Sequence, residues 1–147
     1  MIGPGCVFCE ILAGERPAAI VAREEAALAF LDARPLFKGH VLVVPTQHTA
    51  TLLDLPDARI GPFFSVVKRI ARAVETGLQA DGSFVAMNNK VSQSVPHLHV
   101  HVVPRRRKDG LRGFFWPRDP YETDAERDEY AARIAAAYAG ATASGAS

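Results

Sequence analysis

Three histidines at alternate positions are the residues of this sequence best suited to chemistry. They lie in residues 96–104, PHLHVHVVP, where each histidine is followed by an aliphatic residue. Successive side chains of a β-strand point to opposite faces, so His97, His99 and His101 should share one face, spaced about 6.6 Å apart. Three of the five histidines in the chain lie here. The pattern therefore predicts a strand that carries a functional histidine row.

Two kinds of chemistry fit such a row. In one, neutral imidazoles supply two or three ligands to zinc and leave a position for water, as in a metal-dependent hydrolase. In the other, one imidazole attacks a phosphorus while its neighbours donate hydrogen bonds to phosphate oxygens. Gln93 and Ser94 precede the row with neutral hydrogen-bonding groups, and no Asp or Glu lies between Gly82 and Pro104. These surroundings favour phosphate chemistry.

His99 is the expected nucleophile because it has an imidazole on each side. A histidine near its ordinary pKa of about 6.5 is largely neutral at physiological pH, which leaves one ring nitrogen free to attack. The resulting phospho-histidine bond is labile, so water can complete a double displacement.

Composition limits the class of protein and of partner. The chain has 147 residues, is 48% hydrophobic and carries a formal net charge of +1, which predicts one globular domain with an ordinary core. Near-neutral charge argues against a nucleic-acid partner, so any anionic ligand should be small. We see no signal-peptide pattern and no apolar run approaching the roughly 20 residues of a membrane span. We therefore expect a cytoplasmic protein without a membrane partner.

The order of predicted elements is helix, strands, helix, strands, helix, which indicates an α+β fold with a mainly antiparallel sheet. Apolar residues at helical spacing follow Pro62 until Gly77, and Thr123 and Glu126 form a capping-box pattern. The predicted strands are residues 20–22, 27–32, 40–44, 83–87 and 96–104, and the predicted helices are residues 9–13, 62–77 and 123–140.

The histidine row resembles the signature of the histidine triad (HIT) superfamily, His-φ-His-φ-His-φ-φ with φ apolar, at every position of residues 97–103. Further similar segments are residues 6–11, 28–32, 39–45, 93–96 and 104–105, so the likeness spans roughly residues 6–105. It implies a HIT-like fold, a mainly antiparallel five-stranded sheet with helices packed on it, continuous across a homodimer. It also implies a single HIT domain over 1–147, with a core at about 6–105, a C-terminal extension and helix at 106–140, and a frayed tail at 141–147.

Within the superfamily, the likeness is greatest to histidine triad nucleotide-binding proteins, which are typically homodimers that hydrolyse adenosine phosphoramidates and related nucleoside monophosphate derivatives. The resemblance implies a purine nucleotide ligand and a hydrolase or transferase that requires no cofactor for its chemistry. Its catalytic residues would be nucleotidylated His99, phosphate-holding His101 and Gln93, Ser94 at the leaving group, and His97. Its nucleoside-binding residues would be Asp32 and Asn88 at the ribose, and Phe8, Ile11 and Phe30 as an apolar slot for the base.

Cys6 and Cys9 form a Cys-x-x-Cys pair that fits a zinc site, a redox pair or two small buried side chains. Redox ranks below zinc, because a thioredoxin-like pair follows a strand and only five residues precede this one. Some members of the family close such a site with a Pro-x-x-His histidine and the first triad histidine. The resemblance thus nominates Cys6, Cys9, His48 and His97 as ligands of a structural zinc.

Several features stay open at this stage. His40 either supports the triad by a hydrogen bond or caps its strand. Residues 105–108, RRRK, form either a solvated loop or a contact for a polyphosphate tail. Trp116 either covers a partner subunit's site or packs within the chain. Two further functions also remain open, a dinucleoside polyphosphate hydrolase and a nucleotide-binding regulatory module with little turnover, as do the leaving group and the choice between adenine and guanine.

Overall fold

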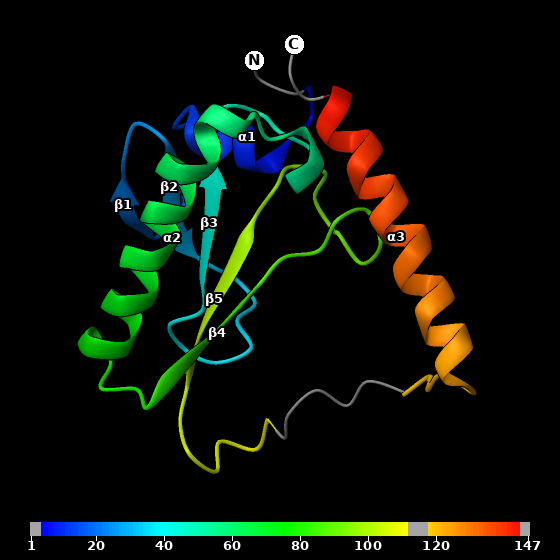
Figure 1. Cartoon of the computed structure of the whole chain (residues 1–147). Coiled ribbons are helices and arrows are strands. Elements are labelled where there is room, and N and C mark those ends of the chain that lie inside the picture. The colour runs from blue at the N-terminus through cyan, green and yellow to red at the C-terminus, as the bar shows by residue number, and fades with distance from the viewer. Residues whose placement is uncertain (1–3, 112–117, 145–147) are drawn as a thin grey trace. The chain divides into compact units, whose positions relative to one another are not determined.

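The structure is a computed structural model that describes residues 4–111 and 118–144. The chain divides into two compact units, residues 1–110 and 111–147. The first unit contains a five-stranded sheet in the order β1-β2-β3-β5-β4, in which every neighbouring pair is antiparallel. Its strands are β1 (Ile20–Arg23), β2 (Ala27–Leu31), β3 (Val41–Pro45), β4 (Gly82–Ala86) and β5 (Val100–Arg105) (Figure 1). The predicted α+β fold with an antiparallel sheet is confirmed.

The histidine row is only partly a regular strand, so the prediction of a strand over 96–104 was wrong at its start. β5 begins at Val100. Continuing its register with β3, where Val41 pairs with Val102, would set Leu98 opposite Pro45, which has no N–H to donate. The Leu98 N–H instead donates to the carbonyl of Thr49 at 2.6 Å. The side chains still alternate, because Leu98, Val100 and Val102 enter one core while the histidines face the other way.

The long helix α2 (Asp57–Gly77) crosses one face of the sheet (Figure 1). It starts five residues earlier than predicted, because Pro62 lies inside the helix and Pro56 is the N-cap. The missing N–H of Pro62 costs one bond near the helix start, and Gly61 carries no Cβ to clash with the proline ring. Its buried residues are Phe63, Val66, Val67, Ile70 and Val74.

The other face of the sheet packs against the short helix α1 (Val7–Leu12), which begins two residues earlier than predicted and has Cys6 as its N-cap. This second core contains Phe8, Cys9 and Ile11 of α1. From the strands it takes the alternate residues Leu28, Phe30, Leu42 and Val44, while Ala27, Ala29, Val41 and Val43 face α2. The histidines share the α1 face, so α1 and the strand ends position the site.

The second unit contains α3 (Asp124–Ser144). The hydroxyl of Thr123 accepts the N–H of Glu126 at 3.0 Å, as the capping pattern predicts, and the helix continues four residues past Gly140. Trp116 lies outside the described residues.

A short 3-10 helix, η1 (Leu52–Asp54), precedes α2 in the first unit. Among the described residues, every helix is too short or too polar to cross a bilayer.

Candidate active site

The three triad histidines lie on the α1 side of the sheet. The ring centroid of Phe8 is 5.1 Å from that of His99 and 5.9 Å from that of His97. The centroids of His99 and His101 are 5.0 Å apart in an edge-to-face arrangement, closer than the roughly 6.6 Å repeat expected for a regular strand. One aromatic side chain of α1 therefore contacts two of the three imidazoles.

The hydrogen bond of His99 determines which of its ring nitrogens can react. Its Nδ1 lies 2.7 Å from the carbonyl oxygen of His97, and a carbonyl only accepts, so Nδ1 carries the proton. In the neutral ring, Nε2 then holds an unprotonated lone pair. His99 is 4% exposed and lines a cavity on the α1 side of the sheet. The geometry thus presents a nucleophilic nitrogen on a fixed ring.

His40, which had no assigned role, orients His101. The Leu36 N–H donates to His40 Nδ1 at 3.1 Å, so the proton of the neutral ring is on Nε2, which donates to His101 Nδ1 at 3.0 Å. The other nitrogen of His101, Nε2, is consequently a donor. Burial, together with the neighbouring His99 and His40, lowers the pKa of His101 to about 4, which keeps it neutral at pH 7. Burial also lowers the pKa of His40, against the opposing effect of Asp32.

The cavity beside His99 has a volume of about 690 Å³, within the usual range for small-molecule sites. It brings together seven of the predicted residues, namely Phe8, Ile11, Phe30, Asp32, Ser94, His99 and His101. It also contains side chains that sequence reasoning missed, including Arg16, Arg34 and Leu42. No local pattern distinguishes these three, because their place in the wall depends on how the segments pack.

Gln93 and Asn88 do not line this cavity. The amide of Gln93 is engaged at both ends, since its oxygen accepts the Lys90 N–H at 2.8 Å and its nitrogen donates to the Ala50 carbonyl at 2.6 Å. Asn88 donates to the carbonyl of Ser92 at 3.2 Å. Both side chains brace the loop before the histidines rather than reach into the cavity.

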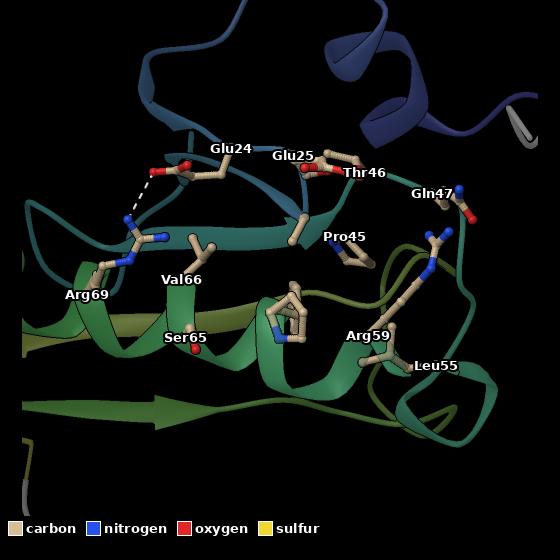
Figure 2. Close-up of a pocket in the computed structure, with 13 residues that line it drawn as sticks. Glu24, Glu25, Pro45, Thr46, Gln47, Leu55, Arg59, Ser65, Val66 and Arg69 are labelled. Carbon is tan, nitrogen blue, oxygen red and sulfur yellow. Dashed lines mark hydrogen bonds and ion pairs between the residues drawn. The ribbon is translucent and has the colours of Figure 1, made fainter. Parts of the chain in front are cut away.

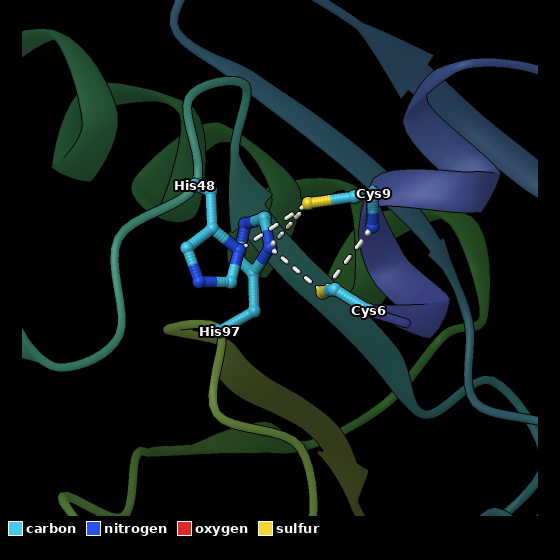
Figure 3. A group of neighbouring side chains, drawn as sticks. All are labelled: Cys6, Cys9, His48 and His97. Carbon is cyan, nitrogen blue, oxygen red and sulfur yellow. Dashed lines mark hydrogen bonds between the residues drawn. The ribbon is translucent and has the colours of Figure 1, made fainter. Parts of the chain in front are cut away.

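The four nominated metal ligands come together at the N-terminus of α1. Figure 3 shows the two thiols of Cys6 and Cys9 facing the rings of His48 and His97. Their ligand atoms all lie within 4.8 Å of one another. The distance from His97 Nδ1 is 3.5 Å to the Cys6 sulfur and 3.6 Å to the Cys9 sulfur, and His48 Nδ1 lies 3.3 Å from the Cys9 sulfur.

This donor set fits zinc. Zinc–sulfur and zinc–nitrogen bonds of about 2.3 and 2.05 Å at tetrahedral angles place sulfur and nitrogen ligands about 3.6 Å apart. His97 Nε2 lies 3.0 Å from the carbonyl oxygen of Pro45 and donates to it, so Nδ1 is the nitrogen with a free lone pair. Burial is the main cause that lowers the pKa of His97 to about 4, which keeps the ring neutral as a ligand must be.

The basic run lies at the opposite end of β5 from His99. Arg105 forms two hydrogen bonds with the carboxylate of Asp109, at 2.6 and 3.1 Å. Arg106 donates to the carbonyls of Leu78 and Gln79, both at 2.7 Å, at the C-terminal end of α2. These contacts give Arg105 and Arg106 a structural role at a distance from the histidines.

A second cavity, of about 500 Å³, lies between α2 and the ends of β2 and β3 (Figure 2). Arg69 of α2 forms an exposed ion pair with Glu24 at 3.1 Å on its rim. None of the predicted site residues lines it. The cavity that contains His99 is therefore the candidate active site.

Comparison with known proteins agrees with this geometry. A model of the HIT domain matches residues 13–108. The chain belongs to the HIT family. An uncharacterised HIT-like protein of Mycobacterium tuberculosis is 41% identical over 120 residues, covering 78% of this chain and 83% of that protein. An adenosine 5'-monophosphoramidase of Schizosaccharomyces pombe is 31% identical and covers 88% of this HIT chain and 98% of its own.

Among solved structures, a zinc-bound histidine triad family protein from Mycobacterium smegmatis superposes with a TM-score of 0.70 at 42% identity. The match covers 84% of this HIT chain and 89% of that chain. The described part of the first unit, residues 4–110, thus has the HIT fold.

Proposed function

We propose that this HIT protein is a nucleotide hydrolase or transferase that cleaves a nucleoside monophosphate derivative, such as an adenosine phosphoramidate, at the α-phosphorus. The reaction passes through a covalent nucleotidyl intermediate on His99. The observation that carries the proposal is the hydrogen bond from His99 Nδ1 to the His97 carbonyl, which leaves Nε2 as an unprotonated nucleophile in the cavity wall. The name of the fission-yeast relative, a monophosphoramidase, supports the same chemistry.

The first step forms a bond from His99 Nε2 to phosphorus and breaks the bond from phosphorus to the leaving group. The leaving amine gains a proton that comes from solvent through the hydroxyl of Ser94, which lines the cavity and directly precedes the triad segment. His101 Nε2–H donates to a non-bridging oxygen as its charge grows. In the second step, the oxygen of a water molecule bonds to phosphorus, the bond from phosphorus to His99 Nε2 breaks, and the surplus proton of the water passes to solvent, so that His99 is released as a neutral ring.

The nucleoside occupies the rest of the cavity in this proposal. Asp32 accepts hydrogen bonds from the ribose hydroxyls, and the apolar side chains Phe8, Ile11 and Phe30 hold the base. The ring of Phe8 is 5.5 Å from that of Phe30 in an edge-to-face arrangement, so both present fixed apolar surface.

We further propose that Cys6, Cys9, His48 and His97 hold a structural zinc ion. When bound, such an ion ties the N-terminus of α1 to the segment that precedes β5. Four protein ligands would close the coordination sphere, so the ion would hold His97 in place without activating water. The His97 carbonyl that accepts the proton of His99 would then belong to an anchored residue.

The geometry disfavours a metal-dependent hydrolase built on the histidine row. His97 directs Nδ1 to the cysteines and His101 directs Nδ1 to His40. Within the part of the chain that the structure describes, a second group of side chains is also close enough to hold a metal ion, namely Asp32, His40 and His101. His99 belongs neither to this group nor to the cysteine–histidine group. The contacts of Arg105 and Arg106 within the chain disfavour a role for these two side chains in binding a polyphosphate tail.

The test is mass spectrometry of the intact protein after rapid mixing with adenosine 5'-phosphoramidate at low pH. We expect a transient adenylyl adduct, mapped to His99 by peptide fragmentation. His99→Ala should form none, whereas the control Arg69→Ala, in the other cavity, should form it normally. An adduct elsewhere, or turnover that survives in His99→Ala, would contradict the mechanism.

A further inference from the structure

We propose that Arg16 recognises the edge of the purine base at the end of the cavity remote from His99, and that it makes this protein prefer guanine to adenine. The inference rests on the proposed function in one respect, that the nucleotide lies with its phosphate at His99. Arg16 lines the same cavity as His99 and the apolar residues of α1.

The order of residues along α1 gives the position of Arg16. Phe8, near the start of the helix, contacts His99 at 5.1 Å between ring centroids. Ile11 lies almost one turn further on, and Arg16 follows the end of α1, where its N–H donates to the Glu10 carbonyl at 3.2 Å. All four residues line the same cavity, and we infer that Arg16, which follows the end of α1, lies at the end of the cavity opposite to Phe8 and His99. In a nucleotide, the base lies farthest from the phosphorus, so its edge would meet this end.

The guanidinium of Arg16 is held in a defined orientation. Its Nε donates to Glu10 Oε2 at 2.7 Å, and the two side chains are 49% and 33% exposed. Glu10 is the only side chain among residues 4–111 found to pair with it, and the bond uses Nε alone. The terminal amino groups remain to donate to a ligand. An arginine fixed through Nε presents those two groups as a fork.

That fork distinguishes the two purines, because arginine only donates. Along the edge that carries N7, guanine offers two acceptors, O6 and N7, while adenine offers N7 together with the donor N6–H₂. Guanine can therefore accept two hydrogen bonds from Arg16. Adenine can accept one and sets its amino group against a donor. The apolar slot treats both bases alike, so the preference would come from Arg16.

The second arginine of the cavity, Arg34, lies beside Asp32. The N–H of Arg34 donates to Asp32 Oδ1 at 2.9 Å, which places its backbone at the carboxylate assigned to the ribose. The sugar is common to both nucleotides, so Arg34→Ala should change binding of both by the same factor. It is the matched comparison for Arg16→Gln.

The experiment measures binding of GMP and AMP by calorimetry, and kcat/KM for guanosine and adenosine phosphoramidates that share one amine. We expect the wild-type protein to prefer guanine by about fivefold to tenfold, at the low end for an arginine fork because Arg16 is half-exposed. Arg16→Gln should abolish the preference for guanine. Arg16→Lys keeps the positive charge but should lose most of this preference. Glu10→Gln should weaken it, and Arg69→Ala should leave it intact.

Equal affinity for GMP and AMP in the wild type, or a ratio unchanged in Arg16→Gln, would overturn the proposal. Binding needs no turnover, so the two proposals fail separately. An Arg16-dependent preference without an adduct on His99 would refute the mechanism and support base recognition by Arg16. An adduct on His99, together with a GMP-to-AMP affinity ratio that does not depend on Arg16, would support the mechanism and refute base recognition by Arg16.

Discussion

At the level of single residues, the hydrogen-bond partner of each imidazole determines which nitrogen can react. His99 donates through Nδ1 and keeps a free Nε2, while His101 accepts at Nδ1 and keeps a donor at Nε2. In the proposed mechanism, the same residue type thus supplies a nucleophile and a hydrogen-bond donor at two positions of one row. The difference comes from a carbonyl in one case and His40 in the other.

The role of His40 can be tested by substitution. Its Nε2–H fixes the ring of His101, so His40→Ala should lower kcat by roughly tenfold or more, the usual effect of losing an orienting partner. His40→Gln, whose amide can donate to the same nitrogen, should recover part of that loss. Thermal melts of both variants control for stability, because His40 is buried. An equal loss of kcat in both variants would contradict an orienting role.

Burial of His101 predicts a pH dependence of stability. Its pKa is lowered to about 4 in the folded chain, against about 6.5 when unfolded. Between these values, the unfolded state binds a proton that the folded state does not, so stability falls as pH decreases from 6.5 toward 4. At pH 5 this ring should cost about 1–2 kcal/mol of unfolding free energy. Urea titrations at pH 7 and pH 5 measure how much the free energy of unfolding falls between these pH values. The fall should be smaller for His101→Gln than for the wild type, and an equal fall would refute the lowered pKa of His101.

At the level of elements, α1 contributes to both sites. Cys6 and Cys9 belong to the candidate zinc site, while Phe8 and Ile11 of the same short helix line the cavity beside His99. A six-residue helix is too short to be stable alone, so its position depends on what holds its ends.

This dependence predicts the effect of removing the metal. Protein purified without chelator should contain about one zinc per chain, and Cys9→Ser should lose it and melt at least about 5 °C lower. Glu15→Gln, which changes an exposed residue just after α1, is the control. A chelator should lower the melting temperature and leave adduct formation on His99 intact. Absence of zinc together with an unchanged melt of Cys9→Ser would remove the metal proposal.

The turn before β3 contains Gly39, whose substitution by Ala should cost more stability than the same substitution at Gly14. Gly39 has φ +96° and a Cβ there would fall against Leu78 Cδ1, whereas Gly14 has φ +76° with nothing within 4 Å of such an atom. Gly14→Ala should cost about 1 kcal/mol for the left-handed backbone alone. Gly39→Ala should cost more, because Leu78 must also move, and it should disturb His40. Denaturant unfolding of the two variants compares the costs, and equal costs would contradict the contact.

At the level of the whole molecule, the resemblance predicts a homodimer. β4 is at one edge of the sheet and pairs only with β5 among the described residues, and its Val85 is 44% exposed. An open edge strand is a template for pairing with a second copy. Light scattering should give twice the monomer mass, and Val85→Lys should weaken the dimer because the two lysines would approach each other. Val91→Lys, in an exposed loop, is the control; a monomeric wild type would refute the prediction.

The sequence by itself determined which face the histidines share and which family the chain joins. Strand alternation depends on neighbouring residues alone, so His97, His99 and His101 could be placed together without knowing the fold. Local rules failed where tertiary contacts compete with them. The row enters β5 only at Val100, because Leu98 would otherwise pair with Pro45, which has no N–H to donate. Helix α2 continues through Pro62.

Tertiary structure alone decided the chemistry of individual atoms. The partner of His101 is 61 residues away in sequence, and that of His97 is 52 residues away. The register of β3 against β5 brings such groups within hydrogen-bonding distance, and it is set by long-range packing. For the same reason, Gln93 bracing its loop and Arg16 joining the cavity wall could not be read from local spacing. Periodicity assigns a side chain to a face, whereas only the packed fold assigns it a partner.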